Sequence, residues 1–265
     1  MNRVSRAVGA LLLLNVAVFL AGLVLSNGSE RVLEAGAFWF PTNEHFRPWQ
    51  FVSYLFLHAD FGHIFFNMFA LASFGTILER EWGPARFLVF YFLCGIGAGL
   101  VQLGINWHHF AGLHEQLVAA GMPAAQIKTL LAMSPEKLDA LWSSGTIQVP
   151  GGPKLEDAFV RLYGIHASPM LGASGAIYGV LVAFGLLYPH ARLAIMFVPV
   201  PVAAKILIPI ILGIDLLSGV TGISLFGAGV AHFAHLGGAA IGFLLMLLWR
   251  KRTREAPVFV VEPPA

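Results

Sequence analysis

Six stretches of this chain are apolar for about the twenty residues that a helix needs to cross a bilayer. They lie at about 7–26, 61–78, 86–105, 172–188, 202–219 and 230–249. Only 11% of all residues are charged and 57% are hydrophobic, whereas a soluble domain carries about 25% charged residues. Too little charge remains to cover a surface that faces water. The sequence therefore predicts an all-α polytopic membrane protein with six transmembrane helices.

The first apolar stretch begins at Ala7 and continues without a charge to Ser26. A signal peptide has a shorter apolar region, of about 7–15 residues, followed by a cleavage site. We therefore expect this stretch to be retained as the first span.

Basic residues predict the orientation, because cytoplasmic loops carry an excess of Lys and Arg. They flank one end of four spans, at Arg3, Arg6, Arg80, Arg86, Arg192 and 250–254. With six spans, all of these ends fall on the same side of the membrane. We therefore expect a multi-pass protein of the bacterial inner (plasma) membrane with both termini in the cytoplasm.

The polar parts of the chain divide it into one membrane domain and a tail. The domain covers 1–254 and contains a long outer loop at about 106–171, between the third and fourth spans. The remaining residues, 255–265, are rich in proline, and we expect a disordered C-terminal tail.

A short helix is predicted within the outer loop. Ser134 suits the cap and Pro135 the first helical position. Leu138, Leu141 and Trp142 then share one face. We expect this apolar face to rest on the outer leaflet.

Ser174 lies at the start of the fourth apolar stretch, within Gly-Ala-Ser-Gly. A serine hydroxyl can attack a peptide bond only if a base takes its proton. His235, near the outer end of the sixth stretch, is the candidate base. Gly237, Gly238 and Gly242 follow it, and small residues let membrane helices approach closely. We therefore expect the fourth and sixth spans to bring His235 to Ser174.

Polar donors occur at a similar depth in the second stretch. His63 and Asn67 are four residues apart and share one helical face. Together with the backbone N–H groups at the start of the helix that carries Ser174, they could stabilise an oxyanion. Gly172 and Gly175 would let the chain bend there.

A carboxylate partner for the base is not evident in the sequence. Asp215 is the one acidic residue within a predicted span, and nothing in the sequence defines its position. The sequence therefore predicts a Ser–His dyad.

The sequence gives little support for a metal site or for nucleic-acid binding. The stretch that starts at His114 begins like His-Glu-x-x-His, but Val118 replaces the second histidine. His108 and His109 could bind a metal only incidentally, and the single cysteine, Cys94, excludes a cysteine-based metal cluster. With no basic patch and no phosphate-binding glycine loop, we expect no cofactor, no metal and no nucleic-acid partner.

The combined motifs resemble the rhomboid intramembrane serine proteases. These motifs are Gly172-Ala173-Ser174-Gly175 with Tyr178, His63-x-x-x-Asn67 preceded by His58, Ala234-His235-x-x-Gly238, and Trp49-Gln50 in the first outer loop. The resemblance extends from about Arg47 to Leu248. It implies a six-helix rhomboid-like bundle with a water-filled cavity that opens to the outer face.

The resemblance also implies roles for the candidate residues. Ser174 would be the nucleophile and His235 the general base. His63, Asn67 and the Ser174 amide would form the oxyanion hole, and Tyr178 would stack beneath His235. The substrates would be single-span transmembrane proteins, cut near the outer membrane surface among the membrane lipids, without a cofactor. The oligomeric state and the physiological substrate remain open.

Two other classes of function are compatible with parts of the sequence. A non-catalytic rhomboid-fold protein would bind or escort membrane helices, but such relatives typically lack the serine or the histidine. A proton-coupled transporter could use His63, His232 and His235, but paired carboxylates and broken helices would then be expected.

Overall fold

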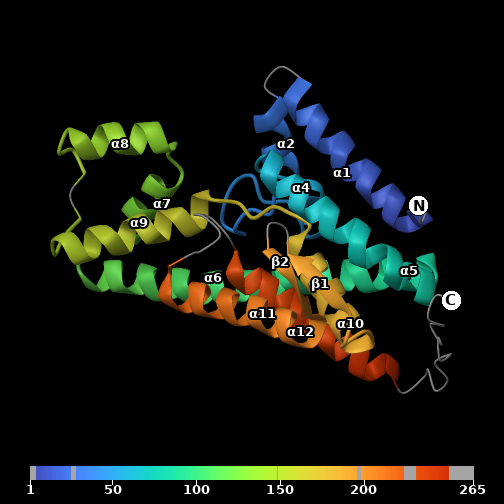
Figure 1. Ribbon diagram of the computed structural model, residues 1–265. Coiled ribbons are helices and arrows are strands. Elements are labelled where there is room, and N and C mark those ends of the chain that lie inside the picture. The colour runs from blue at the N-terminus through green and yellow to red at the C-terminus, as the bar shows by residue number, and fades with distance from the viewer. Residues whose placement is uncertain (1–3, 25–27, 148, 196–197, 224–230, 251–265) are drawn as a thin grey trace, which may run out of the picture.

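The computed structural model describes residues 4–24, 28–147, 149–195, 198–223 and 231–250. The α-helices are α1 (Arg6–Val24), α2 (Gly28–Gly36), α3 (Gln50–Ser53), α4 (Phe61–Ala70), α5 (Thr76–Trp82), α6 (Pro84–Ala119), α7 (Ala124–Leu131), α8 (Pro135–Ser143), α9 (Pro153–Ala167), α10 (Ser174–Leu187), α11 (Ala204–Thr221) and α12 (His232–Arg250) (Figure 1). A 3₁₀ turn, η1 (Tyr54–Phe56), follows α3, and a π-helical segment, η2 (Leu71–Gly75), joins α4 to α5. The predicted tail, 255–265, lies outside the described residues.

Among the described residues, five helices are long and apolar enough to cross a membrane. They are α1, the continuous helix Phe61–Trp82, α6, α11 and α12. The sixth apolar helix, α10, has 14 residues. At a rise of about 1.5 Å per residue it is roughly 21 Å long, shorter than a hydrocarbon core of about 30 Å. The six predicted apolar helices are therefore present, and the fourth is too short to cross the hydrocarbon core.

One end of the bundle is held by a buried carboxylate. Glu79 of α5 accepts hydrogen bonds from the Ser5 hydroxyl at 2.5 Å and from the N–H groups of Ala7 and Val8 at 2.9 and 2.8 Å. The first N–H groups of a helix have no partner within the helix. Glu79 therefore caps α1 from a neighbouring helix and joins the two.

Other contacts gather at the same end. The Tyr188 hydroxyl, just after α10, donates to Glu81 at 2.7 Å. The Arg86 guanidinium, at the start of α6, lies 4.3 Å from the ring centre of Trp249, near the end of α12. The helix ends that carry the basic residues thus meet on one side of the bundle, as their sequence positions predict.

Glycines bring α10 and α12 into backbone contact. A Cβ atom added to Gly238 would lie 1.8 Å from the carbonyl oxygen of Gly175, and one added to Gly242 would lie 2.7 Å from the Cα of Gly179. The two pairs are one turn apart along both helices. Gly237 faces α6 instead, where an added Cβ would lie 2.7 Å from Val101. The predicted close approach of the fourth and sixth spans is therefore present.

A two-stranded sheet lies between α10 and α11. It consists of β1 (Arg192–Ile195) and β2 (Val198–Ala203), which are antiparallel and pair Arg192 with Ala203. This sheet was not among the expected elements, and β2 contains Pro199 and Pro201, although proline disfavours strands. A two-stranded sheet has only edge strands, which tolerate proline.

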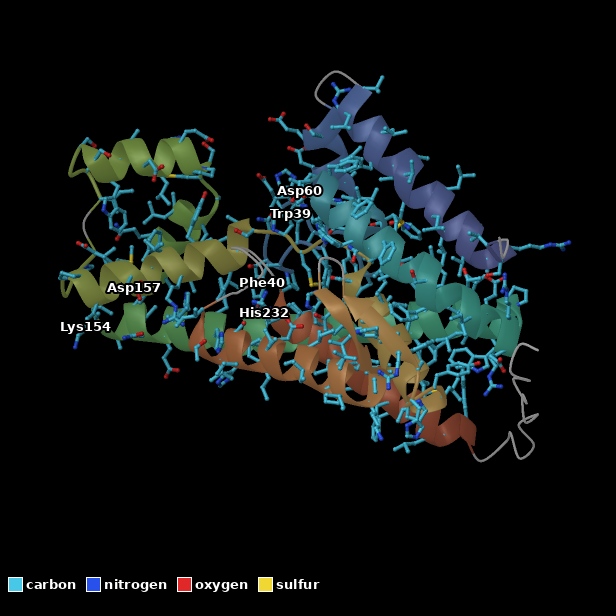
Figure 2. The ribbon with its side chains drawn as sticks, viewed as in Figure 1. Trp39, Phe40, Asp60, Lys154, Asp157 and His232 are labelled. Carbon is cyan, nitrogen blue, oxygen red and sulfur yellow. The ribbon has the colours of Figure 1, made fainter. Side chains whose placement is uncertain are left out.

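The predicted outer loop is a compact helical subdomain and not a loop. Helix α6 continues to Ala119, α9 packs along its second half, and α7 and α8 lie on the far side of α9 (Figure 1). Lys154 and Asp157 of α9 lie in this subdomain, apart from Asp60 at the start of α4 (Figure 2). Its separate core contains Leu117, Met122, Ile127, Leu130, Leu131, Leu138, Ile147, Val149, Ala158, Phe159 and Leu162.

The predicted short helix is present as α8, and its apolar face packs on the subdomain itself. Ser134 caps the helix and accepts a hydrogen bond from the Lys137 N–H. Leu138 is buried, and the Trp142 ring stacks on Phe159 of α9 at 5.9 Å. The apolar face of α8 is therefore covered by protein, because its side chains pack into the core of the subdomain.

Candidate active site

Ser174 is the first residue of α10, and the turn before it depends on a glycine. Gly172 has a φ of +121°, which is strained for other residues, and its N–H donates to the Tyr54 carbonyl at 2.9 Å. The turn places Ser174 at the helix start, where the first backbone N–H groups have no partner within the helix.

The structure brings the candidate base to the candidate nucleophile. The Nε2 atom of His235 lies 2.8 Å from the Oγ atom of Ser174. Tyr178 lies one turn after Ser174, and its ring stacks on the His235 ring at 4.2 Å with planes 13° apart. The glycine contact between α10 and α12 sets this distance, because both side chains project from helices that touch through Gly238.

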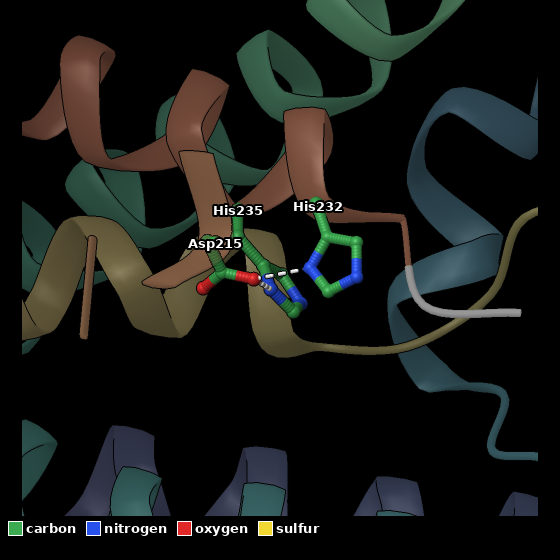
Figure 3. Close-up of side chains that lie close together, drawn as sticks. All are labelled: Asp215, His232 and His235. Atoms are coloured by element: carbon green, nitrogen blue, oxygen red, sulfur yellow. Dashed lines mark hydrogen bonds and ion pairs between the residues drawn. The ribbon is translucent and has the colours of Figure 1, made fainter. Parts of the chain in front are cut away.

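The other nitrogen of the His235 ring faces a carboxylate whose position the sequence does not define. Its Nδ1 atom lies 3.2 Å from Oδ1 of Asp215, on α11 (Figure 3). The same oxygen lies 2.5 Å from Nδ1 of His232, and the Tyr178 hydroxyl donates to Oδ2. Asp215 is fully buried. The one available signal in the sequence was that an acidic residue within a span is costly and usually functional.

His63 lies against the turn that precedes Ser174. A Cβ atom added to Gly172 would lie 2.7 Å from its Nε2 atom. The Ala59 N–H donates to Nδ1 of the same ring at 3.4 Å. Since Nδ1 accepts, Nε2 carries the proton and can donate. Asp60 caps α4 by accepting from the His63 backbone N–H at 2.9 Å, which holds this end of the helix in place.

Asn67 follows one turn later on the same face of α4. It is buried, and within the described part of the chain its Nδ2 atom has no hydrogen-bond partner. Leaving a buried donor unsatisfied costs about 1–3 kcal/mol. An unpaired amide one turn from His63 is available to an oxygen that arrives with the substrate.

His58 packs against His63 from the preceding loop. The two ring centres are 4.9 Å apart in an edge-to-face arrangement. Burial lowers the pKa of His58 to about 3, so the ring is neutral at physiological pH. A neutral His58 can orient His63 without adding charge to the site.

One group of side chains in the described ranges could hold a metal ion. Ligand atoms of Asp215, His232 and His235 lie within 4.8 Å of one another. The hydrogen bonds from both rings to Oδ1 account for this arrangement without an ion. The outer histidines His108 and His109 are neighbours on α6, with ring centres 6.0 Å apart, and are not part of this group.

Curated proteins similar to this chain include mitochondrial and bacterial proteins. RHOMBOID-like protein 12, mitochondrial, of Arabidopsis thaliana is 30% identical over 196 residues, which cover 74% of this chain and 45% of that protein. Rhomboid protein 1, mitochondrial, of Saccharomyces cerevisiae is 28% identical over 71% of this chain and 38% of that protein. Rhomboid protease AarA of Providencia stuartii is 24% identical over 90% of this chain and 70% of that protein.

The chain spans less than half the length of the two mitochondrial relatives. The family model of the rhomboid domain matches 45–137 and 155–252, which covers the site and leaves most of α8 and its connection to α9 unmatched. The motifs around Ser174 and His235 lie within the matched ranges. By this match and by the similarity to the Arabidopsis protein, the chain belongs to the rhomboid family.

Proposed function

We propose that this protein is an intramembrane serine endopeptidase in which Ser174 is the nucleophile and His235 the general base. The observation that carries the proposal is the 2.8 Å distance between Oγ and Nε2. Membership of the rhomboid family supports the class of reaction. Acyl transfer needs a nucleophile, a base within hydrogen-bond reach and donors for the oxyanion. Candidates for these three roles lie on α10, α12 and α4.

The proposed reaction has two halves. Nε2 of His235 takes the Ser174 proton while Oγ attacks the peptide carbonyl carbon and the carbonyl oxygen becomes negative. His63, Asn67 and the Ser174 N–H would donate to this oxygen. The protonated ring then gives its proton to the leaving amine, and an acyl-enzyme remains. Water, deprotonated by the same ring, attacks the acyl-enzyme and releases Ser174.

The proposed substrates are single-span transmembrane proteins, with membrane lipids around the enzyme. Helix α10 is shorter than the hydrocarbon core, and its far end is fixed by Tyr188 and Glu81 on the side with the basic residues. Ser174 would therefore lie below the opposite membrane surface. A substrate helix would need to unwind there, because a helical peptide bond is already hydrogen-bonded and shielded.

A serine-directed fluorophosphonate tests the proposal directly. The probe should label the purified protein in detergent, and mass spectrometry should place the adduct on Ser174. The same preparation should cleave a model single-span substrate. The matched control is Ser218→Ala, which removes a buried membrane-helix hydroxyl on α11 and should label normally. Labelling that persists in Ser174→Ala would exclude the proposed nucleophile.

The alternative is a non-catalytic rhomboid-fold protein that binds or escorts membrane helices. It predicts a protein that captures a single-span helix but neither reacts with the probe nor cleaves. Such a protein has no need for a base within 2.8 Å of a serine. The proximity of Ser174 and His235 therefore favours the protease.

Asn67→Ala should lower kcat much more than it raises KM. An oxyanion donor acts mainly in the transition state, and the loss of one costs about 10²–10³ in kcat. The lower end is expected, since His63 and a backbone N–H would remain. Steady-state cleavage of a single-span substrate measures both constants. An increase in KM with an unchanged kcat would assign Asn67 to substrate positioning instead.

We also propose that the helical subdomain and the opening of the site lie on the non-cytoplasmic side. The basic ends of the spans support this orientation, and Ser144 is exposed on the subdomain. In a Cys94→Ala background, Ser144→Cys should react with a membrane-impermeant maleimide in intact cells or spheroplasts. Labelling that occurs only after lysis would show that the protein has the opposite orientation in the membrane. The relatives come from both mitochondria and a bacterium, so the host membrane should be chosen to match the source organism.

A further inference from the structure

We propose that Asp215 is a positioning residue for the proposed reaction, and that it holds His235 in the tautomer and orientation that make the ring a base for Ser174. The inference rests on the proposed protease function. It extends the predicted dyad by a carboxylate that is itself held in place by Tyr178 and His232.

The first argument is the cost of placing the carboxylate where it is. Asp215 is fully buried on a membrane-spanning helix, where an unpaired charge would be strongly destabilising. Oδ1 faces His232 and His235, and Oδ2 accepts the Tyr178 hydroxyl. Both oxygens are therefore occupied, and the three partners come from the two helices that carry the site.

The second argument concerns the proton on the His235 ring. An ionised carboxylate can only accept, so the 3.2 Å contact requires the proton on Nδ1. Nε2 then presents its lone pair to the Ser174 Oγ, 2.8 Å away. The opposite tautomer would point an N–H at the hydroxyl and could not take its proton. The carboxylate would also stabilise the positive ring that forms when the proton moves.

The third argument is that the carboxylate cannot easily turn away. His232 lies 2.5 Å from Oδ1, and the Tyr178 hydroxyl fixes Oδ2. The Tyr178 ring also stacks on His235, so one side chain orients both the base and the acid. A carboxylate that only joined α11 to α12 would be satisfied by His232 and would not need to reach His235.

Asp215→Asn preserves the shape of the side chain and removes its charge. We expect kcat to fall by between about 10² and 10⁴, with KM within about twofold of wild type. The rate of fluorophosphonate labelling of Ser174 should fall as well, because labelling depends on the activated hydroxyl and not on docking of a membrane helix. Ser218→Ala, one turn along α11 and also buried, is the matched control and should match wild type in both assays.

Tyr178→Phe is the second variant, and it decides the question if Asp215→Asn does not fold. The ring that stacks on His235 remains, and only the hydrogen bond to Oδ2 is lost. We expect a smaller fall in kcat, about tenfold, from a carboxylate that is held less firmly. Thermal unfolding in detergent identifies variants that have lost their fold.

The outcomes separate the two proposals. If wild type cleaves and folded Asp215→Asn has the same kcat and labelling rate, the role of Asp215 is overturned and the dyad remains. The same holds if Tyr178→Phe has an unchanged kcat where Asp215→Asn does not fold. If wild type neither cleaves nor labels, the proposed function itself fails. A change in thermal stability with unchanged kcat would show that Asp215 only joins helices.

Discussion

Cleavage of a single-span substrate should disappear when either Ser174 or His235 is replaced by alanine, while the protein stays folded. The hydroxyl has no base without His235, and the ring has no nucleophile to activate without Ser174. In a soluble serine protease, removing either member costs on the order of 10⁶ in kcat. A loss of that size places cleavage below detection. Because the two residues act as a unit, the double variant should be no worse than either single variant.

Gel-based detection of the two product fragments measures this effect, and thermal unfolding in detergent reports on folding. Ser144→Ala and His109→Ala are matched controls, because both side chains are exposed on the outer part of the molecule. Both should cleave as wild type does. Substantial cleavage by folded Ser174→Ala would rule out the serine mechanism, and substantial cleavage by His235→Ala would require another base.

Gly238→Ala should destabilise the protein strongly. The added Cβ would lie 1.8 Å from the Gly175 carbonyl oxygen, well inside van der Waals contact with backbone that cannot rotate away. Helices α10 and α12 would have to separate. Overpacking usually costs about 1–3 kcal/mol, and a clash between two backbones should exceed about 3 kcal/mol. The distance between Ser174 and His235 would increase with the separation, so cleavage should fall too.

Gly213→Ala is the matched control for this change. Gly213 lies within α11, and an added Cβ would have no heavy atom within 4 Å. Alanine favours a helix over glycine by about 1 kcal/mol, so Gly213→Ala should be neutral or slightly stabilising. Thermal unfolding in one detergent compares the two variants. Equal stability of Gly238→Ala and Gly213→Ala would mean that α10 and α12 are not in backbone contact.

Much of the architecture can be predicted from the sequence, because a bilayer imposes simple rules. A segment that spans it must satisfy its own backbone hydrogen bonds and expose apolar side chains, so spans appear as long uncharged stretches. Polar groups in such stretches are costly and therefore informative. For that reason Ser174, His235, His63 and Asn67 are visible as candidates, and the glycine pattern around Gly238 predicts the helix contact that joins two of them.

Only the tertiary structure decided what Asp215 faces, where the apolar side of α8 lies and that 192–195 and 198–203 pair as antiparallel strands. The position of Asp215 relative to His235 depends on how α11 is rotated against α12, and one polar residue in an apolar helix does not define that rotation. Leu138 and Trp142 are equally apolar whether they contact lipid or Phe159. Their spacing therefore predicts that α8 has an apolar face but not what this face contacts. Length, polarity and period are properties of a segment, and the chain alone determines them; contacts between segments depend on the packing of all the helices together.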